Sequence, residues 1–295
     1  MVTRVTHSTI QRSTLANLQA SLAAGAKLQA QMSSGTKISV PSDDPAGAHD
    51  LLRLRSDLRA ASQHERNRAD GDAWLATVDD SLRESLSIIR AARDLAVKAG
   101  NGSLSPDARE ALASEVEARR DELLQQANAT YSGRHVFAGT SKDPAFGVTP
   151  PYTFSGTAAA TVTREIGPGT TVRVDADGAA TFGTGTSSAF AVLDQLAASI
   201  RAGNPDMAAD LDAVDGRISA MLEQVASVGA RHGQVIAAKD VLMARTVTLK
   251  EQIGGIEDID LAQIVLDVQA QEVAYRGALG AAAKVLQPSL LDFLR

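Results

Sequence analysis

The chain has 295 residues and no cysteine, which excludes disulfides, thiolate metal sites and a cysteine nucleophile. Its formal net charge of −6 argues against nucleic-acid binding, which requires clustered lysine and arginine. Only 3% of the residues are aromatic, so we expect a thin, aliphatic core of the kind that paired helices build.

Residues 1–130 are predicted to be helical almost throughout, because Ala, Leu, Arg, Asp and Glu dominate and strand signals are nearly absent. The first helix is predicted to stop near Ser33-Ser34-Gly35, since glycine commonly ends a helix. Its apolar stripe consists of Leu15, Leu18, Leu22, Leu28 and Met32.

Two further helices follow in the first half of the chain. Pro45 disfavours a helical Asp44, so the segment around it predicts a turn in which Ser42, Asp43 or Asp44 caps the next helix. That helix is expected to run from about Pro45 to Lys98, and Ser105-Pro106 has the cap and first residue of another.

Residues 131–187 change character, because Gly, Pro, Thr, Val, Phe and Tyr replace the helical pattern. We therefore predict a small inserted β domain here. Asp175–Gly178 is predicted to be the turn of a hairpin, and Gly167–Gly169 and Gly183–Gly185 also resemble hairpin turns. The candidate strands are Tyr152–Phe154, Ala160–Ile166, Thr170–Val174 and Ala179–Phe182.

The most informative pattern is a seam at 211–256, where apolar residues recur at alternating steps of three and four. It predicts a helix of about 45 residues, roughly 70 Å long, with a narrow apolar stripe. We interpret this seam as core within the chain. Alternate members of the seam, seven residues apart, are all apolar: Val214, Met221, Val228, Val235, Leu242, Leu249 and Ile256.

The last helix carries a similar stripe, and Pro288 is predicted to end it, leaving a short apolar tail. An isolated pair of terminal helices would bury each stripe on one side only, so we expect both ends to need neighbours. We predict an inter-subunit assembly interface at Leu15, Leu18, Leu22, Leu28, Met32, Leu261, Val265, Val268, Leu279, Leu286, Leu290, Leu291 and Phe293.

These patterns together predict a mainly α fold: an elongated antiparallel bundle of long coiled-coil-like helices, built from both chain ends, with a small inserted β domain. Segments 1–44 and 255–295 are predicted to be terminal assembly segments, mobile in the monomer and helical on assembly. Segments 45–130 and 188–254 are predicted to form a helical bundle domain, and 131–187 the β domain.

The sequence carries no recognisable motif for catalysis or cofactor binding, so we predict no catalytic residue, cofactor or metal, and no enzyme. The histidines form no HExxH group, and the acidic residues Asp43, Asp44 and Asp50 beside His49 fit a helix start better than a metal site. No stretch approaches 18 apolar residues, which predicts no membrane insertion. The first thirty residues lack an apolar segment, which predicts no cleaved signal peptide.

Four motifs in order give the chain a resemblance to the bacterial flagellin superfamily. Met32–Ile38 followed by Ser42–Gly47 resembles the N-terminal signature of that superfamily, and Ile256–Ala262 with Leu286–Leu294 resembles the C-terminal one. Val228–Arg231 is similar to the element before the last helices. The resemblance covers about residues 1–140 and 190–295.

Within the superfamily, three features resemble the hook–filament junction subunits more than flagellin itself. They are the opening Arg4-Val5-Thr6, the proline that follows Asp44, and the stretch Tyr131–Ser141. A flagellin-type filament subunit remains an alternative. A soluble coiled-coil scaffolding or signalling protein is an alternative of another class, and it would lack the β domain.

The resemblance implies an extracellular structural subunit of the bacterial flagellum, exported through the flagellar type III channel without a cleaved signal peptide. It implies that the terminal helices form the inner layer of a tube, with the β domain facing outward. The implied partners are other copies of the chain in a ring or tube, hook-associated protein 1, flagellin and an export chaperone. Nucleic acid and membrane are not among them.

Overall fold

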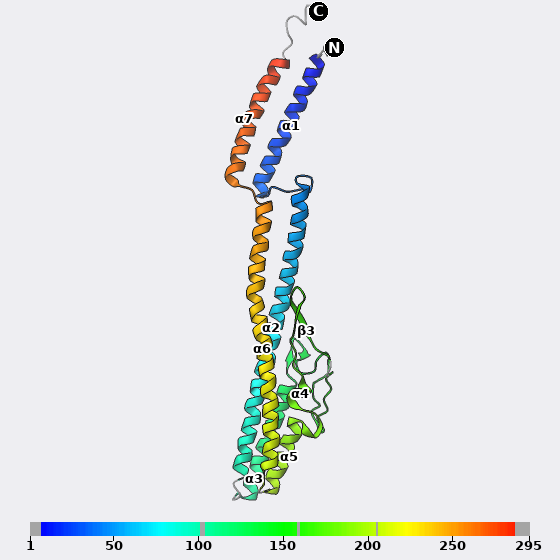
Figure 1. Cartoon of the computed structure of the whole chain (residues 1–295), viewed down its shortest axis with the longest axis vertical. Helices are drawn as coiled ribbons and strands as arrows, with labels where there is room; N and C mark the ends of the chain where they lie inside the picture. The colour runs from blue at the N-terminus through cyan, green and yellow to red at the C-terminus, as the bar shows by residue number, and fades with distance from the viewer. Residues whose placement is uncertain (1–6, 101–103, 158–159, 205, 287–295) are drawn as a thin grey trace, which may run out of the picture. The chain divides into compact units, whose positions relative to one another are not determined.

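The computed structural model describes residues 7–100, 104–157, 160–204 and 206–286, and it divides into two compact units. The terminal unit comprises residues 1–59 and 246–295, and the central unit comprises residues 60–245. Two long helices, α2 (Pro45–Ala99) and α6 (Ala208–Glu257), contribute residues to both units (Figure 1). The mainly helical fold with a small strand region is confirmed.

In the terminal unit, α1 (His7–Ser34) packs against α7 (Leu261–Leu286) (Figure 1). The predicted end of α1 is confirmed: Gly35 has a φ of 75°, which favours glycine, and its N–H donates to Gln31 O at 2.9 Å. The residues that follow α1 lie beside those that precede α7, because Thr36 and Asp258 form an antiparallel bridge. The two helices therefore run antiparallel.

The predicted cap of α2 is also present, and Asp44 supplies it. Its Oδ1 accepts hydrogen bonds from the N–H groups of Ala46 at 3.1 Å and Gly47 at 3.0 Å, groups that have no partner inside the helix. A Cβ at position 47 would lie 2.5 Å from Asp44 Oδ2 and 2.7 Å from Ile38 Cδ1. Glycine is thus required for the close turn into α2.

The central unit packs α3 (Pro106–Ala127) and α5 (Ala189–Ala202) against each other and against the long helices α2 and α6 (Figure 1). Ser105 caps α3 as predicted, accepting a hydrogen bond from Ala108 N at 3.2 Å. The α6 seam is core within the chain: Val214, Met221, Val228, Val235, Leu242 and Leu249 are buried, and Ile256 is half-buried.

The strand region consists of two small antiparallel sheets. β1 (Thr130–Tyr131) pairs with β2 (Arg134–His135), and β3 (Thr163–Gly167) pairs with β4 (Thr170–Arg173). The predicted turn at Gly167–Gly169 joins β3 to β4, and the predicted strand Tyr152–Phe154 is reduced to a single bridge between Phe146 and Phe154.

One predicted hairpin is wrong. Ala179–Phe182 is not a strand but belongs to a short helix, α4 (Gly178–Phe182), because Asp177 Oδ1 caps it by accepting from Ala179 N and Ala180 N. Gly183 then ends this helix, and a 3₁₀ turn at Gly185–Ser187 takes the place of the second predicted turn. The cap outweighs the turn-like composition that suggested paired strands.

The strand region packs against α2 around Trp74, the only tryptophan of the chain. The guanidinium of Arg134, on β2, lies 5.6 Å from the indole centroid, and that of Arg164, on β3, lies 5.5 Å from it. Arg164 also forms an ion pair with Asp70 of α2 at 2.6 Å. Cation–π contacts of this kind dock both sheets on a single helix face.

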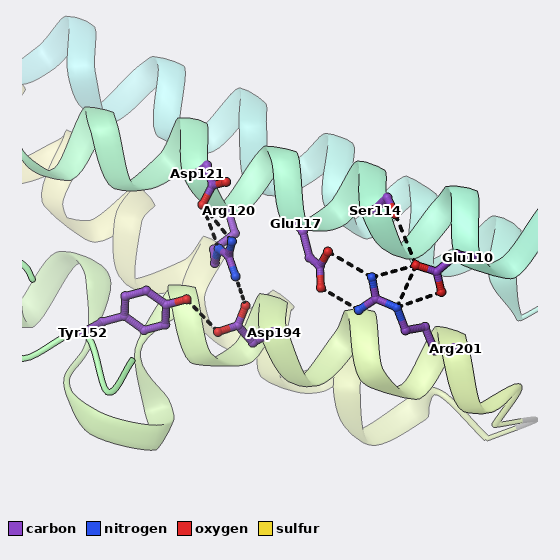
Figure 2. A network of polar contacts seen from close by, with 8 residues as sticks. All are labelled: Glu110, Ser114, Glu117, Arg120, Asp121, Tyr152, Asp194 and Arg201. Atoms are coloured by element: carbon purple, nitrogen blue, oxygen red, sulfur yellow. Dashed lines mark hydrogen bonds and ion pairs between the residues drawn. The ribbon is translucent and has the colours of Figure 1, made fainter. Parts of the chain in front are cut away.

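A polar network joins α3 to α5 (Figure 2). Arg201 of α5 bridges two acids of α3, with Nε 2.9 Å from Glu110 Oε2 and Nη1 2.5 Å from Glu117 Oε1. Further along, Arg120 pairs with Asp194, whose other oxygen accepts the hydroxyl of Tyr152 at 2.7 Å. Burial and the hydrogen bond to Asp194 raise the pKa of Tyr152 to about 12.

Candidate assembly interface

The contact between α1 and α7 is made mostly by small and polar side chains. The more shielded residues recur at steps of three and four along each helix, so each helix presents a single stripe to the other. The stripe of α1 consists of Thr14, Leu18, Ser21, Gly25, Leu28 and Gln31. The stripe of α7 consists of Ile264, Val268, Gln271, Tyr275, Ala278 and Ala282.

A hydrogen-bonded layer crosses the middle of this contact. Gln271 Nε2 donates to the backbone oxygen of Ser21 at 2.8 Å and lies 2.9 Å from its hydroxyl oxygen. A polar layer of this kind specifies the register of a helix pair at some expense in stability. Only Ile264 and Ala282 are fully buried in the two stripes, so the pair has little core of its own.

The predicted interface residues separate into two groups. Leu18, Leu28 and Val268 belong to the stripes just described and are half-buried within the chain. The remaining described members expose between 39% and 65% of their surface: Leu15, Leu22, Met32, Leu261, Val265 and Leu279. The side chain of Leu286, and the whole of Leu290, Leu291 and Phe293, lie outside what the structure describes.

The stripe that α7 presents to α1 lies beside most of the predicted assembly residues of this helix, which remain a predicted inter-subunit surface. The intramolecular stripe runs through Ile264, Gln271 and Ala278, not through Leu261, Val265 and Leu279. The sequence could not choose between these phases, since α7 carries apolar residues nearly all the way round. A helix that is apolar on every side is normally one that becomes buried on every side.

A groove of about 370 Å³ runs along one side of the helix pair. Helical geometry, at about 100° per residue, places Leu15 of α1 and Leu261, Val265 and Leu279 of α7 on the same side as the groove. The exposed group therefore extends the groove along both helices. Its principal lining residues are Leu22, Ala26, Met32, Val268, Glu272 and Tyr275.

The loop that follows α1 and the loop that precedes α7 contact each other, and both contain the sequence signatures. Lys37 N donates to Glu257 O at 2.6 Å, and Arg55 Nη2 lies 2.7 Å from both carboxylate oxygens of Glu257. Lys27 Nζ lies 2.8 Å from Asp43 Oδ1. This joint cannot be predicted from the sequence, because nothing local in either loop indicates its partner.

Asp43 is the most perturbed acid of the joint. The ion pair with Lys27, followed by hydrogen bonds from the N–H groups of Val40 and Ser39, holds its pKa well below the usual range. Asp43 thus organises the loop before α2 while Asp44 caps the helix. Both acids have structural partners of their own, which supports the helix-start interpretation over a metal site.

Metal-binding groups and membrane-spanning helices are not found among the described residues. Within them, no group of three or more His, Cys, Asp and Glu side chains is placed to hold a metal, and no described helix is long and apolar enough to cross a membrane. His232, on the α6 seam, lies 2.7 Å from Asp72 Oδ1 of α2 and so has a structural partner. The apolar surface of the terminal unit is therefore the candidate functional site.

The chain is similar in sequence to known bacterial flagellar proteins. Residues 5–142 match the bacterial flagellin N-terminal helical region. The chain is 27% identical over 279 residues to flagellar hook-associated protein 3 of Salmonella typhimurium, covering 85% of this chain and 87% of that protein. Flagellin A of Vibrio anguillarum is 36% identical over 117 residues, but these span only 39% of this chain and 31% of that flagellin.

The fold is shared with solved structures as well. The flagellar junction protein FlgL of Legionella pneumophila superposes with a TM-score of 0.56 at 14% identity, covering 64% of this chain and 99% of that one. The family model, the relatives and the helical fold agree with one another. The chain is therefore similar to the bacterial flagellins over residues 5–142 and to flagellar hook-associated protein 3 over most of its length.

Proposed function

We propose that this chain is a structural subunit of the flagellum that forms the hook–filament junction ring, linking hook-associated protein 1 to flagellin. One observation carries the proposal. The terminal helix pair leaves six of its predicted interface residues between 39% and 65% exposed, on the side of the groove. Burying a large apolar side chain completely contributes about 1.5–3 kcal/mol, and only the exposed part of that gain remains here, so covering this surface favours association.

The proposal gives the two units different tasks. The central unit is a folded body with its own core, whereas segments 1–44 and 255–295 supply the surface that other subunits cover. A helix pair with so little internal burial gains most of its stability from assembly. This also suits a chain that is exported unfolded through the flagellar type III channel, with a chaperone on its C-terminal segment.

A junction role is favoured over a filament role by the extent of the similarity. The likeness to hook-associated protein 3 covers most of both chains, whereas the flagellin match covers less than a third of that flagellin. A flagellin-type filament subunit is the second candidate, supported by the higher identity in the matched region. A continuous coiled-coil scaffold is disfavoured by the two sheets and the aromatic cluster of the central unit.

The test is a strain that lacks this protein, examined by electron microscopy. A junction subunit predicts hooks without filaments and flagellin released into the medium. Restoring the wild-type chain should restore filaments, and so should a matched variant of the central unit, Leu222→Ser, which alters an exposed leucine of α6. A strain that keeps normal filaments without the protein would contradict the junction role.

Variants of the terminal unit sharpen the same test. Val265→Asp and Leu279→Asp place charges on the exposed side of α7 without touching its stripe against α1. We expect secreted protein of normal central-unit stability that fails to support filaments, because a buried unpaired charge opposes association. Filaments on these variants would show that this surface is not an interface.

A further inference from the structure

A second apolar face lies on α7, away from the groove. Leu266 and Val273 expose 60% and 70% of their surface and are among the most exposed large apolar residues described. Leu266 lies two residues before Val268, which is a rotation of about 200°, so the two side chains leave the helix about 160° apart. One face of α7 is thus directed to α1 and the groove, and the opposite face is uncovered.

This second face permits a close approach by another helix. Gly277 and Gly280 lie on it, and a Cβ built on either would meet no atom within 4 Å. The face therefore protrudes at Leu266 and Val273 and is flat at the two glycines. Small residues of this kind let helix axes come close together.

The dimensions of the two faces correspond. The groove is lined by Leu22 and Met32 of α1, ten residues and about 15 Å apart along the helix. Leu266 and Val273 are seven residues apart, which is about 10 Å. A pair of apolar side chains with that separation fits within the length of the groove.

The two faces also carry opposite charges, from Glu272 and Arg276. Glu272 lines the groove, and Arg276 lies between the groove side and the second face of α7. Within one chain their closest atoms are 3.6 Å apart, with both side chains mostly exposed, so the internal pair is weak. Each partner is therefore available to an opposite charge on another molecule.

We propose that the Leu266–Val273 face of one copy docks in the α1–α7 groove of the next copy, with Arg276 of the first copy near Glu272 of the second. This inference rests on the proposed self-assembly and specifies its geometry. Because the two docking surfaces are different faces of one unit, the contact is heterologous, repeating from copy to copy in one direction. Contacts of this type build rings or tubes, whereas a face that pairs with itself stops at a dimer.

The geometry is tested by cross-linking between copies, which is clean because the chain has no native cysteine. One population carries Leu22→Cys in the groove and the other Val273→Cys on the opposite face. After the two full-length variants are mixed, allowed to assemble and treated with a short bismaleimide, we expect 22–273 dimers. A chain carrying both cysteines should give a ladder of higher oligomers, and Ser87→Cys on the central unit should give neither.

The outcomes separate this inference from the function it rests on. Assemblies in which only 22–22 or 273–273 dimers form would overturn the heterologous docking but leave self-assembly intact. A chain that forms no assemblies at all would overturn both. Assemblies without any cross-link at these positions would also overturn the docking, since it brings the two side chains together.

Charge reversal provides a second measurement that does not depend on cross-linking. Glu272→Arg and Arg276→Glu should each raise the concentration needed for assembly, by roughly two- to fivefold for an exposed pair. The double variant restores opposite charges across the interface and should return that concentration to the wild-type value. A double variant that assembles worse than either single variant would contradict the proposed pairing.

Discussion

Apolar residues follow the same heptad spacing in both units, but they are buried to very different extents. In the terminal unit, only Leu51, Leu54, Leu249, Ile264 and Ala282 are buried apolar residues, and all the other buried apolar residues of the described chain lie in the central unit. Most of the exposed large apolar residues, by contrast, lie in the terminal unit. A stripe of equal regularity can thus serve an internal core or an external contact.

The composition of the contact stripes explains the difference. Along α6, Val214, Met221 and Val228 meet other large side chains and reach complete burial. Between α1 and α7 the corresponding positions include Ser21, Gly25 and Gln271, which have little apolar area to bury. Most of the large apolar side chains of α7 instead lie on its exposed sides.

The largest expected effect comes from the central core. Leu82 is fully buried, so Leu82→Ala should lower the free energy of unfolding of the central unit by about 2–5 kcal/mol through lost burial and the cavity it leaves. Its matched control is Leu22→Ala in the terminal groove, which should change the same quantity by less than about 0.5 kcal/mol. Urea denaturation measures both, and equal effects would abolish the distinction between the units.

An intermediate effect is expected at the network between α3 and α5 (Figure 2). Asp194→Ala removes the carboxylate that pairs with Arg120 and accepts the hydrogen bond of the Tyr152 hydroxyl. Both of these interactions are partly buried. We expect a loss of about 1–3 kcal/mol in unfolding free energy. Tyr152→Phe, which removes only the hydroxyl, should lose less, and a larger loss for Tyr152→Phe would contradict this hierarchy.

The last expected effect is a change of stability with pH above 10. The pKa of Tyr152 is about 12 in the folded chain, so the unfolded chain loses this proton first, near pH 10. The stabilisation is therefore complete below about pH 10 and is lost as the pH rises through 12. Absorbance titration of wild type against Tyr152→Phe should show one tyrosine that ionises late, and its absence would show that the hydroxyl is not held by Asp194.

Much of the fold follows from local signals in the sequence. Gly35 ends α1, Asp44 caps α2 and Ser105 caps α3, because each of these residues satisfies backbone groups a few positions away. The α4 helix was missed since Asp177-Gly178 suits both a hairpin turn and a helix start, and only the surrounding packing decides between them.

The terminal helices could be located from the sequence, but the residues that join them could be predicted only in part. The exposed leucines of α1 and α7 were singled out, and so was Val268 of the α7 stripe. Ile264 and Gln271 of that stripe were not, because an apolar residue occupies nearly every face of the helix. The contacts of Lys37 and Arg55 with Glu257 join residues some 200 positions apart, and no local pattern encodes such a pairing. Which residues of two distant segments meet is decided only when the whole chain folds.

Hydrogen exchange of backbone amides on the purified monomer tests most directly whether the terminal helices depend on other copies. The account predicts weak protection for residues 7–34 and 261–286, strong protection for the core helices of the central unit, and a large gain in the terminal helices after assembly. Terminal helices that are already as protected as α3 and α5 in the monomer would contradict it.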